Sequence, residues 1–237
     1  MRINARLALL DIEGTVSPLA FVRDVMFPFA AARYESFFER RFNDPGLAGT
    51  IDALKSEGSR EAIPVRLECW RDVADYCARL TREDRKATGL KAAQGLIWDE
   101  GFASGELQPP LFADVRPALE RWRGGGVGLA VYSSGSEHAQ RQFFAHTVEG
   151  NLAGLFQAFF DTSVGMKKES SSYAAIARRL GVPAPEICFF SDVVAELEGA
   201  HQAGMRAVLV RRPGNATQPL WAGLVLESLE GVELAAG

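Results

Sequence analysis

Strand-like and helix-like segments alternate through the second half of the chain, and this order constrains the fold more than any other feature. Short apolar runs typical of buried strands separate segments whose apolar residues recur at helical spacing. In order, the sequence predicts helix 115–123, strand 127–132, helix 137–145, strand 158–160, helix 171–180, strand 187–191, helix 194–203 and strand 206–210. This order predicts an α/β fold with a Rossmann-like parallel sheet and helices on both of its faces.

A further strand is predicted near the N-terminus, where an apolar run ending at Leu10 is followed by Asp11, Glu13 and Gly14. In open α/β sheets, ligands bind at the carboxyl ends of the strands. By itself, an acidic turn after a strand is often only a solvated connection or a helix N-cap. Asp11 and Glu13 become candidates for chemistry because three later motifs also pair strand ends with residues that phosphoryl transfer requires.

Residues 17–108 have a different character. Their apolar residues follow helical spacing in segments 30–41, 47–55, 64–80 and 82–102, without a strand pattern. The sequence therefore predicts a catalytic core formed by residues 1–16 and 109–237, with an all-helical cap of residues 17–108 inserted after the first strand. Such a cap can act as a lid that excludes water from the strand-end crevice, or it can simply buttress the core.

Charge and composition exclude several classes of protein. The 237 residues carry a net charge of -4, so no basic surface of the kind that binds nucleic acid is expected. The first apolar run is too short for a signal sequence or a membrane span, which favours a cytoplasmic protein without membrane contact. The three cysteines lack the spacing of a disulfide framework or a zinc site.

Two of the three later motifs offer partners for a phosphate. Ser133 and Ser134 follow a predicted strand and precede a helix, so hydroxyl and N–H groups are expected where a phosphate would bind, although ordinary N-capping is an alternative. Lys167 lies in a loop after Gly165 and can neutralise phosphate oxygens, with Lys168 as the adjacent competitor.

The third later motif adds another acid at a strand end. Asp192 follows the predicted strand 187–191, and Glu196 lies four residues further on, either as a partner of a metal site or as an exposed charge. Asp11 is the candidate nucleophile, since a carboxylate can attack phosphorus and form an aspartyl-phosphate. One Mg2+ is expected between this carboxylate and the phosphate, held by Asp11, Asp192 and the carbonyl or carboxylate of Glu13. The Glu13 side chain can alternatively protonate the leaving group and then activate water.

With these four motifs in this order, the whole chain resembles the haloacid dehalogenase-like superfamily of phosphohydrolases. More narrowly, it is similar to the enolase-phosphatase family of methionine salvage. The strings that carry this resemblance are DIEGT (11–15), FVRDVMFP (21–28), QGLIW (94–98), GEL (105–107), YSSGS (132–136), SDVVAE (191–196) and RPGNA (212–216). Glu13, in place of the usual second aspartate of the superfamily, is the most specific position, whereas Val16 departs from a threonine common in these proteins.

The resemblance implies a monomeric, Mg2+-dependent enzyme with a helical cap on a Rossmann-like core. Its substrate would be 2,3-diketo-5-methylthiopentyl-1-phosphate, which the enzyme would enolise and then dephosphorylate to the acireductone 1,2-dihydroxy-3-keto-5-methylthiopentene. Matched position by position, the metal residues are Asp11, Glu13 and Asp192, the substrate-binding residues are Ser133, Ser134 and Lys167, and the catalytic residues are Asp11, Glu13 and Lys167.

Three alternatives remain open from the sequence. A capped phosphatase or phosphomutase could act on another small phosphate ester with the same motifs. A haloacid dehalogenase is less favoured, because displacing halide needs no acid and leaves Glu13 unexplained. A non-catalytic phosphate- or metal-sensing module would be expected to have lost one of the motifs, and all four are present.

Overall fold

The computed structural model describes residues 1–235, and this chain divides into two compact units. Met1–Phe21 and the chain from Gln108 onward form one unit, and Val22–Leu107 form the other. The predicted core of residues 1–16 and 109–237 and the predicted cap of 17–108 describe a similar division, while the capping role itself stays a prediction. Residues 236 and 237 of the predicted core lie outside the described residues.

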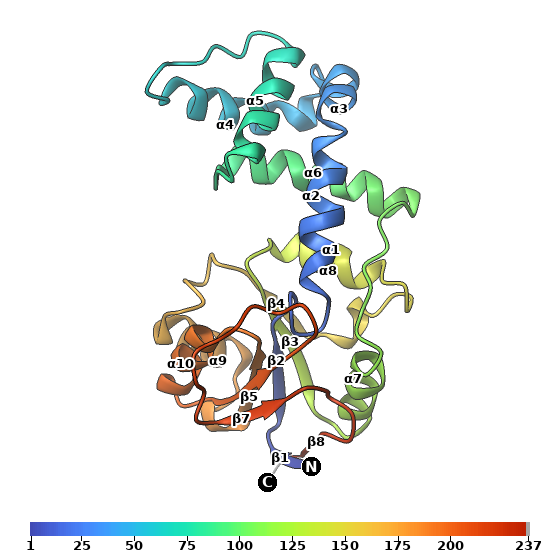
Figure 1. Cartoon of the computed structure of the whole chain (residues 1–237), viewed down its shortest axis with the longest axis vertical. Coiled ribbons are helices and arrows are strands. Elements are labelled where there is room, and N and C mark those ends of the chain that lie inside the picture. Colours follow the sequence, from blue (N-terminus) through green and yellow to red (C-terminus); the bar gives the residue numbers. More distant parts are fainter. Residues whose placement is uncertain (236–237) are drawn as a thin grey trace. The chain divides into compact units, whose positions relative to one another are not determined.

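The first unit is built on a six-stranded, all-parallel sheet (Figure 1). Its strands, in spatial order, are β4 (Ala158–Phe160), β3 (Gly128–Tyr132), β2 (Leu7–Leu10), β5 (Ile187–Ser191), β6 (Arg206–Val210) and β7 (Leu224–Leu226). Leu10 pairs with Val131 on one side and Phe190 on the other. The residues that follow β2, β3 and β5 therefore leave the sheet side by side at one edge.

Helices cover both faces of this sheet, which confirms the predicted Rossmann-like α/β class. On one face, α9 (Ser170–Leu180) and α10 (Val194–Gln202) share an apolar core with the strands, in which Phe189 is fully buried. On the other face, Trp122 of α7 (Val115–Gly124) stacks on Phe190 of β5, with ring centroids 5.4 Å apart. Phe144 of α8 (Glu137–Ala145) packs on Phe159 of β4 at 6.1 Å. Consecutive residues of β5 thus face opposite layers, as the two-residue period of a strand requires.

Several short elements carry no pattern that predicts them. β1 (Arg2–Asn4) and β8 (Glu233–Ala235) form a separate two-stranded parallel sheet, and β7 extends the edge of the large one. Each has three residues and lies outside the alternation of helices and strands that identifies the equally short β4. The remaining short helices of this unit are α1 (Leu19–Phe21), η3 (Ala153–Leu155) and η4 (Ala184–Glu186).

The second unit contains helices and connecting loops but no strand within residues 22–107, all of which the structure describes. Its elements are the π-helix η1 (Val22–Met26), α2 (Phe27–Ala31), α3 (Tyr34–Arg41), the 3-10 helix η2 (Pro45–Leu47), α4 (Ala48–Ser59), α5 (Trp70–Arg82) and α6 (Thr88–Ser104). They enclose a core of their own that contains Tyr34, Phe37 and Phe38. Within the described chain, no helix is both long and apolar enough to cross a lipid bilayer.

Two helix starts in this unit differ from the prediction. Helix α5 begins at Trp70 and not at residue 64, because the Asp72 carboxylate accepts hydrogen bonds from the backbone N–H groups of Glu68 (2.8 Å) and Cys69 (3.0 Å). That arrangement is a helix N-terminus, so the preceding residues stay non-helical. Helix α6 begins at Thr88 and not at residue 82, since Asp84, with φ of 49°, interrupts the chain between the two helices.

Candidate active site

Three predicted site residues directly follow neighbouring strands. Asp11 comes after β2, Ser133 after β3 and Asp192 after β5, and all three are buried. The Asp11 backbone N–H donates to the carbonyl oxygen of Phe190 at 3.0 Å, which ties the end of β2 to the end of β5. The parallel register therefore brings these residues, far apart in sequence, to one edge of the sheet.

Lys167 reaches this edge from the loop that precedes α9. Its Nζ lies 2.6 Å from Asp11 Oδ1 and 2.8 Å from Glu196 Oε2, and the side chain is buried, whereas Lys168 is exposed. Burial lowers the pKa of Lys167, but the charges of Asp11 and Glu196 outweigh burial and raise the pKa above its ordinary value. Lys167 is therefore a buried ammonium beside the candidate nucleophile.

Glu196 is the second acid on this ammonium, and its alternative interpretation as an exposed charge is wrong. The side chain, on α10, is only 12% exposed and accepts a hydrogen bond from Ser191 Oγ at 2.9 Å. Burial, and then the charge of Asp11, raise its pKa to about 7, although Lys167 acts in the opposite direction. The spacing of four residues from Asp192 was the one signal in the sequence that pointed to Glu196.

The donor set at the strand ends fits a divalent cation. Burial and the negative charge of Asp11 raise the pKa of Asp192 to about 7, and the charge of Glu13 adds to this effect. Two buried carboxylates that repel each other favour a cation between them, and carboxylate oxygens are the ligands that Mg2+ prefers. In residues 1–235, no three His, Cys, Asp or Glu side chains form a metal-binding group, so further ligands would be backbone oxygens or water.

The acidic turn after Asp11 is fixed by residues from the loop after β6. Gly14 has φ of +72°, and a side chain at this position would collide with the Asp192 carboxylate. Asn215 Nδ2 donates to the Gly14 carbonyl (2.9 Å), and Arg212 Nε donates to the Thr15 carbonyl (3.0 Å). The RPGNA string thus positions the turn that carries Glu13, a role that the sequence interpretation did not assign to Arg212 or Asn215.

The serine motif combines a buried and an exposed residue. Ser133 is buried at the end of β3, and Ser134 is exposed. Capping of α8 is performed by Ser136, whose Oγ accepts from the backbone N–H of Ala139 at 3.2 Å, and the N–H of Glu137 donates to Asp161 at 3.3 Å. Two N–H groups of the first turn of α8 are therefore occupied within the protein. The contact of Ser133 and Ser134 with a phosphate stays a prediction.

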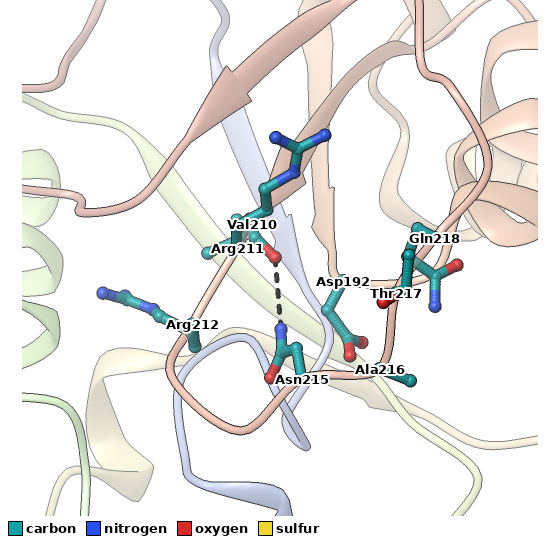
Figure 2. Close-up of a pocket in the computed structure, with 8 residues that line it drawn as sticks. All are labelled: Asp192, Val210, Arg211, Arg212, Asn215, Ala216, Thr217 and Gln218. Atoms are coloured by element: carbon teal, nitrogen blue, oxygen red, sulfur yellow. Dashed lines mark hydrogen bonds between the residues drawn. The ribbon is translucent and has the colours of Figure 1, made fainter.

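A pocket of about 370 Å3 opens beside Asp192. Figure 2 shows the Asp192 carboxylate beside Asn215, with the loop after β6 forming the pocket wall. The remaining residues that line it are Val210, Arg211, Arg212, Ala216, Thr217 and Gln218. Its volume lies at the lower end of the range typical of small-molecule sites.

Comparisons with known proteins agree with this arrangement. Residues 6–204 match the family model described as haloacid dehalogenase-like hydrolase. Enolase-phosphatase E1 of Synechococcus elongatus is 43% identical over 214 residues, which are 88% of this chain and 90% of that protein. Enolase-phosphatase E1 of Aquifex aeolicus is 42% identical over 206 residues, which are 87% of this chain and 90% of that protein.

Solved structures show the same fold. The UTR4 protein of Saccharomyces cerevisiae superposes with a TM-score of 0.81 at 29% identity, covering 96% of this chain and 100% of that one. CbbY of Rhodobacter sphaeroides, in complex with phosphate, has a TM-score of 0.64 at 15% identity over 96% of this chain and 97% of that one, which speaks for the fold alone.

The fold, the strand-end acids with their buried lysine, and the family match define a hydrolase of the haloacid dehalogenase-like type. The chain belongs to this family and, within it, to the enolase-phosphatase E1 family. It is accordingly an enzyme, a phosphatase by family, and the family assignment made from the motifs is confirmed.

Proposed function

We propose that this chain is the Mg2+-dependent enolase-phosphatase that converts 2,3-diketo-5-methylthiopentyl-1-phosphate to 1,2-dihydroxy-3-keto-5-methylthiopentene and phosphate. The relatives named enolase-phosphatase E1 support the pair of activities. The observation that carries the phosphatase half is the buried Lys167 ammonium, 2.6 Å from an Asp11 carboxylate at a strand end. This pair provides both a nucleophile and a positive charge for the incoming phosphate.

In the phosphatase step, an Asp11 oxygen attacks phosphorus, and the bond from phosphorus to the ester oxygen breaks. Lys167 neutralises the negative charge of the transferred group, while the Ser133 and Ser134 hydroxyls bind its oxygens. Glu13 gives a proton to the leaving oxygen and then takes one from the water that hydrolyses the aspartyl-phosphate. Asp11 is thereby returned to its starting state.

Asp11 and Asp192 would hold the metal through their carboxylates, and Glu13 through its backbone carbonyl, since no third acidic side chain joins the two carboxylates in residues 1–235. When bound, Mg2+ supplies the charge neutralisation that lets a carboxylate approach a phosphate dianion, and it polarises the substrate carbonyl next to the acidic C–H. The unit Val22–Leu107 is proposed to serve as the cap that excludes water from the reaction. We further propose that the enzyme is a cytoplasmic monomer that binds neither nucleic acid nor membranes.

Incubation with the diketone phosphate tests this function when enol absorbance and inorganic phosphate are followed together. An enol signal that precedes phosphate release is expected. Phosphate without an enol signal would instead favour the second candidate, a capped phosphatase or phosphomutase for another small ester. Asp11→Asn should abolish phosphate release with an unchanged circular dichroism spectrum, and normal turnover by this variant would exclude the aspartyl-phosphate.

A further inference from the structure

The loop that carries Lys167 is held by three side-chain hydroxyl groups on three successive backbone carbonyls. Tyr132 Oη donates to the Gly165 carbonyl at 2.9 Å, and Ser172 Oγ donates to the Met166 carbonyl at 2.8 Å. Tyr173 Oη donates to the carbonyl of Lys167 itself at 2.6 Å. Each peptide unit of this short loop therefore has its own hydroxyl partner, an arrangement that we call the hydroxyl clamp.

The three donors are rigid because each belongs to a packed element. Tyr132 ends β3, Ser172 and Tyr173 lie in the first turn of α9, and all three are buried. The rings of Tyr132 and Tyr173 meet edge to face with centroids 5.4 Å apart, and Tyr173 also packs on Phe189 at 5.1 Å. Aromatic pairs of this kind restrict the rings, so the positions of the two phenol hydroxyls are set by the core.

Gly165 permits the close approach that the hydroxyl clamp requires. Its φ of +138° is a conformation that residues with a side chain rarely adopt. A side chain at this position would also collide with Ser172 Oγ. The Gly-x-Lys order of residues 165–167 is thus explained by the clamp, since the glycine lets α9 approach the backbone next to the lysine.

A fixed backbone matters at Lys167 because its side chain is long and flexible. Four methylene groups separate the backbone from Nζ, which must reach Asp11 and Glu196 simultaneously. The ammonium also lies 5.9 Å from the centroid of the Tyr132 ring, so the same tyrosine borders both the loop and its charged end. A displacement of the backbone at residue 167 would be passed directly to the ammonium.

We propose that Tyr132, Ser172 and Tyr173 are positioning residues of the phosphatase reaction, which hold the backbone of residues 165–167 so that the Lys167 ammonium meets the phosphate. The inference rests on the proposed function of Lys167 and extends it to residues that do not contact the substrate. It predicts that removing a clamp hydroxyl affects the reaction only through Lys167.

The first test is Tyr173→Phe, which removes the hydroxyl and keeps the ring. We expect kcat to fall by about 10- to 100-fold, as for a misplaced catalytic group, and the Kd for inorganic phosphate, measured by calorimetry with Mg2+ present, to rise by a similar factor. Tyr132→Phe should act in the same direction. Ser172→Ala tests the inference in the same way should either tyrosine variant fail to fold.

Tyr34→Phe is the matched control. Tyr34 is also a buried tyrosine, whose hydroxyl bonds to Thr81 Oγ1 (2.9 Å) and Gln94 Nε2 (3.1 Å) within the helical unit. Removal of the Tyr34 hydroxyl should lower the Tm about as much as Tyr173→Phe does. The kcat and the phosphate affinity should stay at their original values. An equal loss of activity in both variants would attribute the effect to general destabilisation and overturn the inference.

A double-mutant cycle with Lys167→Ala separates positioning from a structural role. If the hydroxyl clamp acts through Lys167, Tyr173→Phe should weaken phosphate binding in the original protein and leave it unchanged in the Lys167→Ala background. Additive effects would overturn the clamp and leave the role of Lys167 intact. Phosphate affinity and turnover that are unaffected by Lys167→Ala would instead refute the proposed role of Lys167, and the clamp with it.

Discussion

A single ammonium satisfies two buried acids at the end of β2. Lys167 lies between Asp11 and Glu196, and a buried carboxylate is stable as an anion only where a cation or hydrogen-bond donors compensate its charge. Glu196 has a further donor in Ser191, while Asp11 shares its surroundings with the carboxylate of Asp192. The charge of Lys167 therefore acts on Asp11, Glu196 and Asp192.

The adjacent lysines give a direct test of this charge. Lys167→Met keeps a long apolar side chain and removes the ammonium, so we expect phosphate release to fall by at least about 100-fold, the size of loss found when one charge-stabilising group is removed. Lys168→Met is the control, because Lys168 is exposed. Steady-state kinetics of both variants make the comparison, and equal activities would contradict the assignment of Lys167.

At the residue scale, the sequence identified the strand-end residues better than their supports. Asp11, Ser133 and Asp192 could be found because each follows an apolar run, and Lys167 because of its spacing from Gly165. Arg212 and Asn215 were marked only as letters of the RPGNA string, which gave them no role. Their contacts to the carbonyls of Gly14 and Thr15 depend on how two loops approach each other, which periodicity does not encode.

At the scale of elements, the turn after β2 is determined by close backbone approach. Gly14 has φ of +72°, and the Asp192 carboxylate occupies the space that a side chain at this position would need. Gly181, at the end of α9, has φ of +65°, but the space around it is open. Both positions favour glycine for conformational reasons, but only Gly14 also needs it for space. The two glycines therefore separate the effect of backbone strain from the effect of steric displacement.

Gly14→Ala and Gly181→Ala exploit this difference. Each should lower the free energy of unfolding by about 1–2 kcal/mol through left-handed backbone strain, measured by urea denaturation. Only Gly14→Ala is expected to lose activity as well, because the new methyl group displaces Asp192 or the turn that carries Glu13. A Gly14→Ala variant with unchanged kcat would show that this turn does not need its present geometry.

Elements that belong to a recognisable pattern were predictable, and the others were not. The alternation after residue 109 predicted the core helices and the strands between them, including β4, which has only three residues but lies between two predicted helices. The three-residue strands β1, β7 and β8 are defined by pairing between distant segments, as in the register of Arg2 with Glu233. The start of α5 depends on the side-chain cap supplied by Asp72, which apolar spacing alone does not reveal.

For the whole molecule, one ion pair connects segments of the first unit that are distant in sequence. Arg212 Nη1 lies 2.9 Å from Asp114 Oδ2, and the same carboxylate accepts from Ser228 Oγ (3.1 Å) and from the backbone N–H of Leu229 (2.5 Å). The start of α7, the loop after β6 and the segment before β8 meet at this carboxylate. Burial opposes the charge of Asp114, but the N–H group of Leu229 and the Arg212 guanidinium outweigh burial and lower the pKa of Asp114 below its ordinary value.

Asp114 should therefore make stability depend on pH. Because its folded pKa is depressed, its contribution is present above the unfolded pKa of about 3.9 and is lost as pH falls through the folded pKa. Asp114→Asn should lower the free energy of unfolding at pH 7 by about 2 kcal/mol, as expected for lost charged hydrogen bonds, and the difference should shrink toward pH 3. Asp84→Asn, which removes an exposed ion pair with Lys86, is the control and should have no measurable effect. A pH-independent difference at Asp114 would contradict this role.

Metal binding should also be visible in the stability of the whole fold. Asp11 and Asp192 repel each other in a buried site, so a cation that binds only the folded protein should raise its Tm. We expect Mg2+ at about 100 times its Kd to stabilise the original protein by about 2.7 kcal/mol relative to EDTA, measured by calorimetry at pH 8.

Asp192→Asn removes one of the repelling charges, so this variant should be more stable than the original protein in EDTA and should gain little from Mg2+. Asp52→Asn, at an exposed position of α4, should keep the full Mg2+ response. If Asp192→Asn also kept the full stabilisation by Mg2+, the cation would bind elsewhere. Lys167 alone would then have to compensate the negative charges of Asp11 and Asp192.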